Sequence, residues 1–144
     1  MVERVIGGLN MTFEEMNEIV QKNPFAKYIG MELLEITEGY ALGRISFEKQ
    51  YENIYGGMHG GCAYSLADTL AGIAASTYGE LVTTLDASMN YLLPVENTEY
   101  VYCRAKVLRH GRKVSVIRVE IYNDTETILI DGSFTYYNLG KKNK

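Results

Sequence analysis

The longest helical pattern of apolar positions lies between residues 62 and 78. Two apolar stripes recur there at helical spacing. The larger side chains are Cys62, Leu66, Leu70 and Ile73, and the small ones are Ala63, Ala67, Ala71 and Ala74. The pattern predicts one helix of about four to five turns. Because this helix is apolar almost all round, we expect it to lie buried in the core.

Six segments with strand-like alternation flank this helix. They span residues 31–37, 40–47, 81–92, 100–109, 113–123 and 127–138. The first two are joined at Glu38-Gly39 and predict a hairpin. The third alternates less cleanly than the others, and in the fifth the apolar phase slips between Val116 and Ile117, which predicts a bulge or a strong bend. The order predicts an α+β fold, with an antiparallel sheet of five to six strands across the helix.

A short amphipathic pattern precedes the strands. Thr12 is followed three residues later by Glu15, a capping-box signature, and apolar residues then recur at helical spacing. We expect a helix over about 12–23 that Pro24 ends, because the residue before a proline is disfavoured in the helical region. A further turn should follow from Phe25. The tail at 140–144 is basic, and we expect it to be frayed.

Composition limits the classes of protein. The 144 residues suffice for one domain over 1–144, without repeats or linkers. The net charge of -4 gives no general reason to expect nucleic acid or an anionic membrane as partner. The first ten residues do not form a signal peptide, and no apolar run approaches a membrane span, so we expect a cytoplasmic protein. Cys62 and Cys103 lack the spacing of a zinc site or a redox pair, so we expect no metal.

Glycines crowd the chain just before the long helix, at Gly56, Gly57, Gly60 and Gly61. The first amides of a helix have no partner within it and carry partial positive charge, so they can meet an oxyanion closely. Asp68 is the only formal charge between His59 and Gly79. Burying a lone carboxylate is costly. Asp68 therefore either faces water or ties down a loop, or it serves as a general base or nucleophile in a cleft.

The spacing of the helix start and Asp68 constrains any shared chemistry. His59 precedes Asp68 by nine residues, which corresponds to about 13 Å along a helix. One chain cannot bring both ends to one carbonyl group. A two-fold dimer with antiparallel central helices would place Asp68 of one chain beside the Gly60 amide of the other. We therefore predict an active site shared across a homodimer interface.

Three further residues near the helix start have alternative interpretations. His59 is a candidate site residue, but a histidine beside a helix start can also organise the glycine loop by hydrogen bonds. Cys62 beside His59 could be a thiolate nucleophile, although it falls on the apolar face, where free cysteines are commonly buried. Asn53 is a candidate site residue or a turn residue.

These residues resemble the hotdog-fold thioesterases, specifically the phenylacetate-degradation type of acyl-coenzyme A thioesterase. The resemblance covers roughly residues 25–138. It rests on Asn53, the run Gly57-Met58-His59-Gly60-Gly61, Leu66-Ala67-Asp68, residues 84–91 with Pro94, and Gly111-Arg112. It implies an antiparallel sheet wrapped around a central helix, paired into a homodimer and often into a homotetramer.

The resemblance also implies roles for matching positions. Asp68 would be the general base or nucleophile for the thioester, and the Gly60 amide would polarise the thioester oxygen. Asn53 and His59 would line the site, and Thr84 would help to position water beside Asp68. The substrate-binding set that we expect consists of Gly61 and a basic turn that could grip coenzyme A phosphates, namely Arg109, Arg112 and Lys113. That turn could equally be a solvated hairpin end.

The sequence thus favours an acyl-coenzyme A thioesterase that needs no cofactor beyond the coenzyme A of its substrate. The resemblance implies a short-chain, medium-chain or aromatic acyl group. One alternative is a hotdog-fold hydratase or dehydratase of 3-hydroxyacyl thioesters, which would use His59 and an acid on the carbon chain of the substrate. Another is a non-catalytic acyl-coenzyme A binding module, although such a module has no need of Asp68 together with Thr84.

Overall fold

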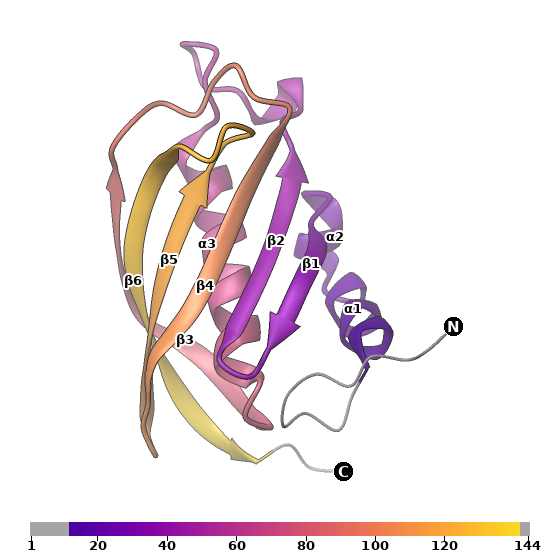
Figure 1. The fold of residues 1–144 in the computed structure, drawn as a ribbon, viewed down its shortest axis with the longest axis vertical. Helices are drawn as coiled ribbons and strands as arrows, with labels where there is room; N and C mark the ends of the chain where they lie inside the picture. Colours follow the sequence, from indigo (N-terminus) through magenta and orange to yellow (C-terminus); the bar gives the residue numbers. More distant parts are fainter. Residues whose placement is uncertain (1–11, 142–144) are drawn as a thin grey trace.

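The computed structural model describes residues 12–141. The elements follow in the predicted order (Figure 1). They are α1 (Phe13–Gln21), α2 (Pro24–Tyr28), β1 (Glu32–Thr37), β2 (Tyr40–Ser46), the 3-10 turn η1 (Lys49–Tyr51), α3 (Gly60–Ser76), β3 (Glu80–Tyr91), β4 (Tyr100–His110), β5 (Val114–Tyr122) and β6 (Ile128–Lys141). Within the described range, no helix is long and apolar enough to cross a membrane.

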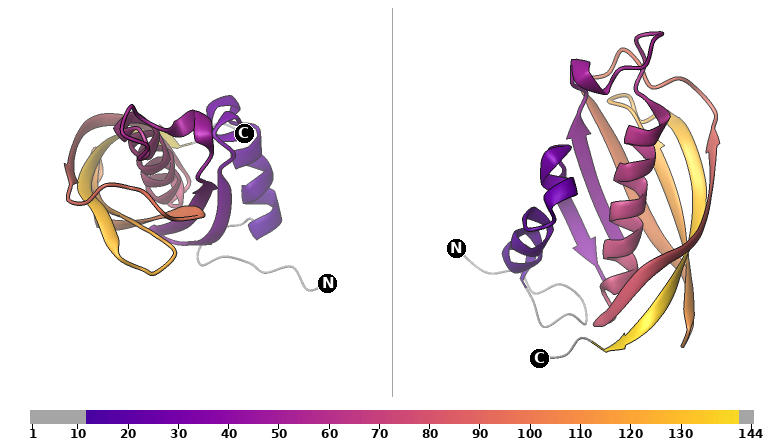
Figure 2. Two further views of the ribbon diagram at one scale, coloured as in Figure 1. Left: turned by 90° about the horizontal axis from the view of Figure 1, so that it is seen from above. Right: turned by 180° about the vertical axis from the view of Figure 1, so that it is seen from behind.

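The six strands form one antiparallel sheet in the order β1-β2-β4-β5-β6-β3. The sheet curls around α3, which is seen nearly end-on in the left view of Figure 2, and α1 and α2 lie outside beside β1. This is the α+β hotdog arrangement that we expected. Strand β3 is an edge of the sheet, so one side of its backbone has no strand partner in the described chain.

Helix α3 buries five alanines and two leucines against the sheet. The buried positions are Ala63, Leu66, Ala67, Leu70, Ala71, Ala74 and Ala75. On β2, a Cβ at Gly43 would lie 3.0 Å from Leu70 Cδ2 and 2.9 Å from the Glu32 carbonyl oxygen. The glycine therefore allows the helix to lie close against the strand. The other side of α3, including Ile73, is only half-buried, so the expectation of a fully buried helix holds for one side.

Two strand irregularities bear on the sequence prediction, one correcting it and one explaining it. The predicted slip in the fifth strand is wrong, because β5 alternates regularly and its buried positions begin with the polar Ser115. The extra residue lies on the neighbouring strand β4, at Leu108. In β3, Leu85 is an extra residue between Thr84 and Asp86. This bulge explains why the third segment alternates less cleanly.

The N-terminal helices follow their capping signals. The Glu15 amide donates to Thr12 Oγ1 at 3.2 Å, as the capping signature predicts. Asn23 caps α2, with Pro24 as its first residue. The predicted frayed tail is wrong for Gly140 and Lys141, because both continue β6 and pair with β3. The rest of that tail lies outside the described residues.

Candidate active site

Asp68 lies in the middle of α3, and two hydroxyl groups from the sheet reach it. Thr84 Oγ1 on β3 donates to Asp68 Oδ1 at 2.7 Å. The Tyr136 hydroxyl on β6 lies 2.6 Å from the same oxygen. The side chain is half-buried and lines an open hollow of about 520 Å³ between α3, β3 and α1. Because its partners belong to strands, Asp68 does not tie down a loop.

The start of α3 leaves one amide free. The Gly60 N–H has no hydrogen-bond acceptor between residues 12 and 141, and it lies at the positive end of the helix dipole. The Tyr91 hydroxyl donates to the Gly60 carbonyl at 3.0 Å. A Cβ at residue 60 would lie 3.3 Å from Tyr91 Cε1. Glycine therefore keeps this amide accessible beside the tyrosine ring.

His59 is the N-cap residue of α3, and its Nδ1 accepts a hydrogen bond from the Gly61 amide at 2.9 Å. An accepting Nδ1 carries no proton, so this hydrogen bond assigns the neutral ring with its proton on Nε2. The ring therefore organises the glycine loop, as one interpretation of the sequence held. The Nε2 proton remains available for a ligand, so the capping role of His59 is compatible with its predicted position in the site.

We predict that His59→Ala lowers the free energy of unfolding by about 1 kcal/mol, because the Gly61 amide loses its acceptor. His59→Asn should remain within about 0.5 kcal/mol of wild type, because asparagine is a good N-cap residue. Urea unfolding measures both changes. Equal losses of stability in the two variants would show that capping is not what the ring contributes.

Asn53 organises the loop that precedes α3. Its Oδ1 accepts from the Tyr55 amide at 2.8 Å and from the Gly57 amide at 3.2 Å. The same side chain lines, together with Gly60, a second hollow of about 310 Å³. Asn53 Nδ2 has no acceptor in the part of the chain that the structure describes. The side chain thus combines a turn role with a position beside the free amide.

Within one chain, the predicted site residues form two separate groups. Asp68 and Thr84 form the first, and the helix start with Asn53, His59 and Gly60 forms the second. Asp68 follows Gly60 by more than two turns of α3, which corresponds to about 12 Å. The two residues line different hollows. One chain therefore does not place the carboxylate beside the free amide.

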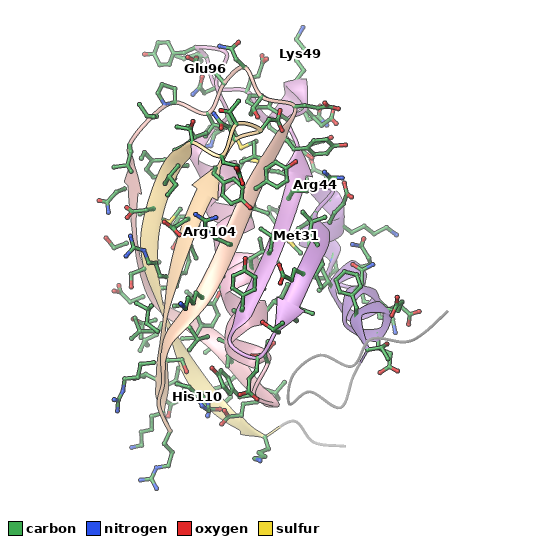
Figure 3. The ribbon with its side chains drawn as sticks, in the orientation of Figure 1. Met31, Arg44, Lys49, Glu96, Arg104 and His110 are labelled. Atoms are coloured by element: carbon green, nitrogen blue, oxygen red, sulfur yellow. The ribbon has the colours of Figure 1, made fainter. Side chains whose placement is uncertain are left out.

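The basic turn between β4 and β5 lies at the other end of the molecule from the helix start. Its exposed cationic residues are Arg109, Arg112 and Lys113. Figure 3 shows His110 of this turn at one end, and Lys49 and Glu96, which lie by the loops near the helix start, at the opposite end. The turn therefore does not approach Gly60 of its own chain.

Cys62 has the environment of a thiol rather than a thiolate. It is half-buried on the first turns of α3. Burial raises the pKa of its thiol, which disfavours the charged nucleophile at neutral pH. His59 and Gly61 lie with it around a third hollow, but the His59 Nδ1 is already engaged by the Gly61 amide. These observations disfavour the alternative of a cysteine nucleophile.

Two tyrosines complete these groups, and neither was predicted as a site residue. Tyr91 belongs to the group at the helix start, and Tyr136 belongs to the group around Asp68. Tyr91 covers Gly60, and Tyr136 contacts Asp68. Both lie on strands, and they contact α3 because the sheet curls around that helix. The sequence does contain one signal, because Tyr136 falls on the same face of its strand as Phe134.

Comparisons with known proteins agree with this architecture. A family model described as the thioesterase superfamily matches residues 55–130. The chain is 25% identical over 129 residues to a putative esterase from Archaeoglobus fulgidus, covering 89% of this chain and 84% of the relative. It is 24% identical over 114 residues to the acyl-coenzyme A thioesterase PaaI from Escherichia coli, covering 79% and 81% of the two chains.

Solved structures show the same fold. The structure of the E. coli PaaI protein from the phenylacetic acid degradation operon has a TM-score of 0.85 at 22% identity, covering 90% of this chain and 94% of that chain. A hypothetical thioesterase from Streptococcus pneumoniae, solved with coenzyme A, has a TM-score of 0.75 at 24% identity, covering 79% and 89%.

Proposed function

The chain belongs to the thioesterase superfamily and is a thioester hydrolase, and we propose that it cleaves acyl-coenzyme A to a free acid and coenzyme A. The observation that carries the proposal is the Asp68 carboxylate, which accepts a hydrogen bond from Thr84 and faces an open hollow. Placing a carboxylate there costs solvation. A module that only bound acyl-coenzyme A would gain nothing from it.

In the proposed reaction, Asp68 takes a proton from water while the water oxygen bonds to the thioester carbonyl carbon. The electron pair of the carbonyl bond moves onto its oxygen, where the Gly60 amide stabilises the negative charge. When the carbonyl bond forms again, the carbon–sulfur bond breaks and the thiolate leaves. Asp68 then gives its proton to the thiolate, which is released as the thiol. In the alternative, Asp68 itself attacks the carbonyl carbon, the thiolate leaves, and water hydrolyses the resulting anhydride. This route requires the same positions of Asp68 and the Gly60 amide.

We propose that two chains share this site. The support is the separation of Asp68 and Gly60 in one chain, since a two-fold axis with antiparallel α3 helices removes it. Strand β3 adds support, because it is a sheet edge of 12 residues beside the Asp68 hollow. The same two-fold relation would bring the basic turn of one chain toward the helix start of the other. Arg109, Arg112 and Lys113 would then contact coenzyme A phosphates at the partner's site.

The hollow beside Asp68 favours an apolar acyl group. Beyond the carboxylate, its walls include Gly72, Ile73 and Val82, with Val20 of α1 on the outer side. Such a lining suits a short or medium aliphatic chain or an aromatic ring. Among the relatives, PaaI is an acyl-coenzyme A thioesterase, and the S. pneumoniae structure contains coenzyme A.

Thiol release from a panel of aliphatic and aromatic acyl-coenzyme A substrates tests the proposed function. We expect turnover of at least one member, and its acyl group would define the substrate class. A crotonyl-type substrate that gains water without releasing thiol would instead identify a hydratase. Binding of several members with no release of thiol from any of them would identify a binding module.

A further inference from the structure

Tyr136 and Thr84 approach Asp68 as a pair that the sheet register creates. The two residues lie directly opposite each other on β6 and β3. Their hydroxyl groups converge on the same carboxylate oxygen, Asp68 Oδ1, at 2.6 Å and 2.7 Å. Leu85 is the extra residue of the bulge immediately after Thr84. The bulge changes the phase of β3, so that Val82 before it and Ala87 after it both pack against the core.

The Tyr136 hydroxyl is held from two sides. It lies 2.6 Å from Asp68 Oδ1 and 2.5 Å from the Asp68 carbonyl oxygen. A phenol has one proton and donates it to one of these oxygens at a time. The carboxylate is the stronger acceptor because it is charged, so the proton is assigned to Oδ1. Contact with the helix backbone as well as the side chain locates the hydroxyl relative to α3.

The ring of Tyr136 is also held by packing. It is 4% exposed, and it lies against Gly72, where a Cβ would be 3.2 Å from both Tyr136 Cε2 and the hydroxyl oxygen. Burial, followed by the hydrogen bond to Asp68, raises the pKa of the phenol well above its usual range. The hydroxyl therefore stays protonated at neutral pH and can donate a hydrogen bond to Asp68.

The other carboxylate oxygen has no such donors. Asp68 Oδ2 accepts no hydrogen bond from any residue between 12 and 141. Oδ2 is also not buried, because between residues 12 and 141 Arg44 Nε is the one buried side-chain nitrogen or oxygen without a hydrogen bond. Because the carboxylate lines the open hollow, Oδ2 is the oxygen accessible to a ligand there.

We infer that Tyr136 is a positioning residue that, with Thr84, holds Asp68 by Oδ1 and so directs Oδ2 at the reacting atoms. This inference rests on the proposed thioester hydrolysis. It assigns the proton abstraction, or the nucleophilic attack, to Oδ2 in particular. A carboxylate without these two donors could rotate about its side-chain torsions and would present Oδ2 correctly for only part of the time.

Tyr136→Phe tests the inference, because it removes only the hydroxyl and keeps the ring. We expect kcat to fall about tenfold, as for the loss of one hydrogen bond to a charged group, with KM within about twofold of wild type. Tyr137→Phe is the matched control, because Tyr137 is exposed on the other face of β6, and it should leave both constants unchanged.

A double-mutant cycle shows whether the hydroxyl acts through Asp68. In a D68N background, Tyr136→Phe should leave the residual kcat unchanged.

Two results would overturn the inference while thioester hydrolysis by the wild type stands. One is a Tyr136→Phe variant with the wild-type kcat and only a lower urea midpoint, which would make the hydroxyl merely structural. The other is an equal loss of kcat in the wild-type and D68N backgrounds. If the wild type releases no thiol from any acyl-coenzyme A, the proposed function itself fails, and the inference falls with it.

Discussion

Asp68→Asn is expected to reduce thiol release from the preferred acyl-coenzyme A by about a hundredfold or more. The amide has nearly the same shape as the carboxylate, but it can neither accept the proton from water nor attack the carbonyl carbon. The Thr84 hydroxyl can still donate to its carbonyl oxygen, so the fold should be retained. Single-turnover and steady-state assays of thiol release, with circular dichroism as a check on folding, measure the effect.

Asp131→Asn provides the matched control for that variant. Asp131 lies on β6, 3.4 Å from Arg118 in an ion pair that is partly exposed to solvent, and exposed pairs of this kind contribute little to stability. The control should keep wild-type turnover. If Asp68→Asn also turned over at the wild-type rate, Asp68 would be a structural carboxylate and the proposed mechanism would be wrong.

Gly60→Val is expected to reduce kcat by about a hundredfold or more, comparable to the loss of one oxyanion donor. The donor is a backbone amide, so no side-chain substitution can delete it, and displacement is the available perturbation. A Cβ at this position meets the Tyr91 ring at 3.3 Å, and the branched side chain of valine adds further atoms there. Either the Tyr91 ring or the Gly60 amide must then move, and the valine side chain also crowds the space between them.

Gly60→Ala is a milder form of the same substitution. Alanine adds only the Cβ, which a shift of a few tenths of an ångström can accommodate, so its loss of kcat should be smaller than that of valine. Urea unfolding of both variants separates lost chemistry from lost stability. A valine variant that is folded and fully active would exclude the Gly60 amide as the oxyanion donor.

Much of the fold could be predicted because it depends on local periodicity. The alanine stripe of α3 marks the buried side of the helix, and the alternation of the fourth segment matches the burial of Val101 and Cys103 on one face. The bulge at Leu85 could not be predicted in this way, because it depends on which residue of β6 lies opposite. Ser115 misled the prediction for β5, since a buried hydroxyl breaks the apolar pattern without breaking the strand.

The candidate site also has one part that local sequence predicts and one part that depends on how the strands pair. The roles proposed for Asp68 and for the helix-start amide were inferred from residue type and position on one helix. The link between Asp68 and Thr84 came only from the family resemblance, and Tyr136 was missed altogether. Alternation places Tyr136 on the inner face of its strand, but only the pairing of β6 with β3 puts its hydroxyl beside Asp68.

Mixed dimers of Asp68→Asn and Gly60→Val chains test most directly the claim that two chains share one site. Each variant alone should be nearly inactive. When equal amounts are coexpressed, half of the dimers are heterodimers, and in each of them one of the two sites combines an intact Asp68 with an intact Gly60. The account predicts recovery of about one quarter of wild-type activity. A mixture no more active than the two variants measured separately would contradict it.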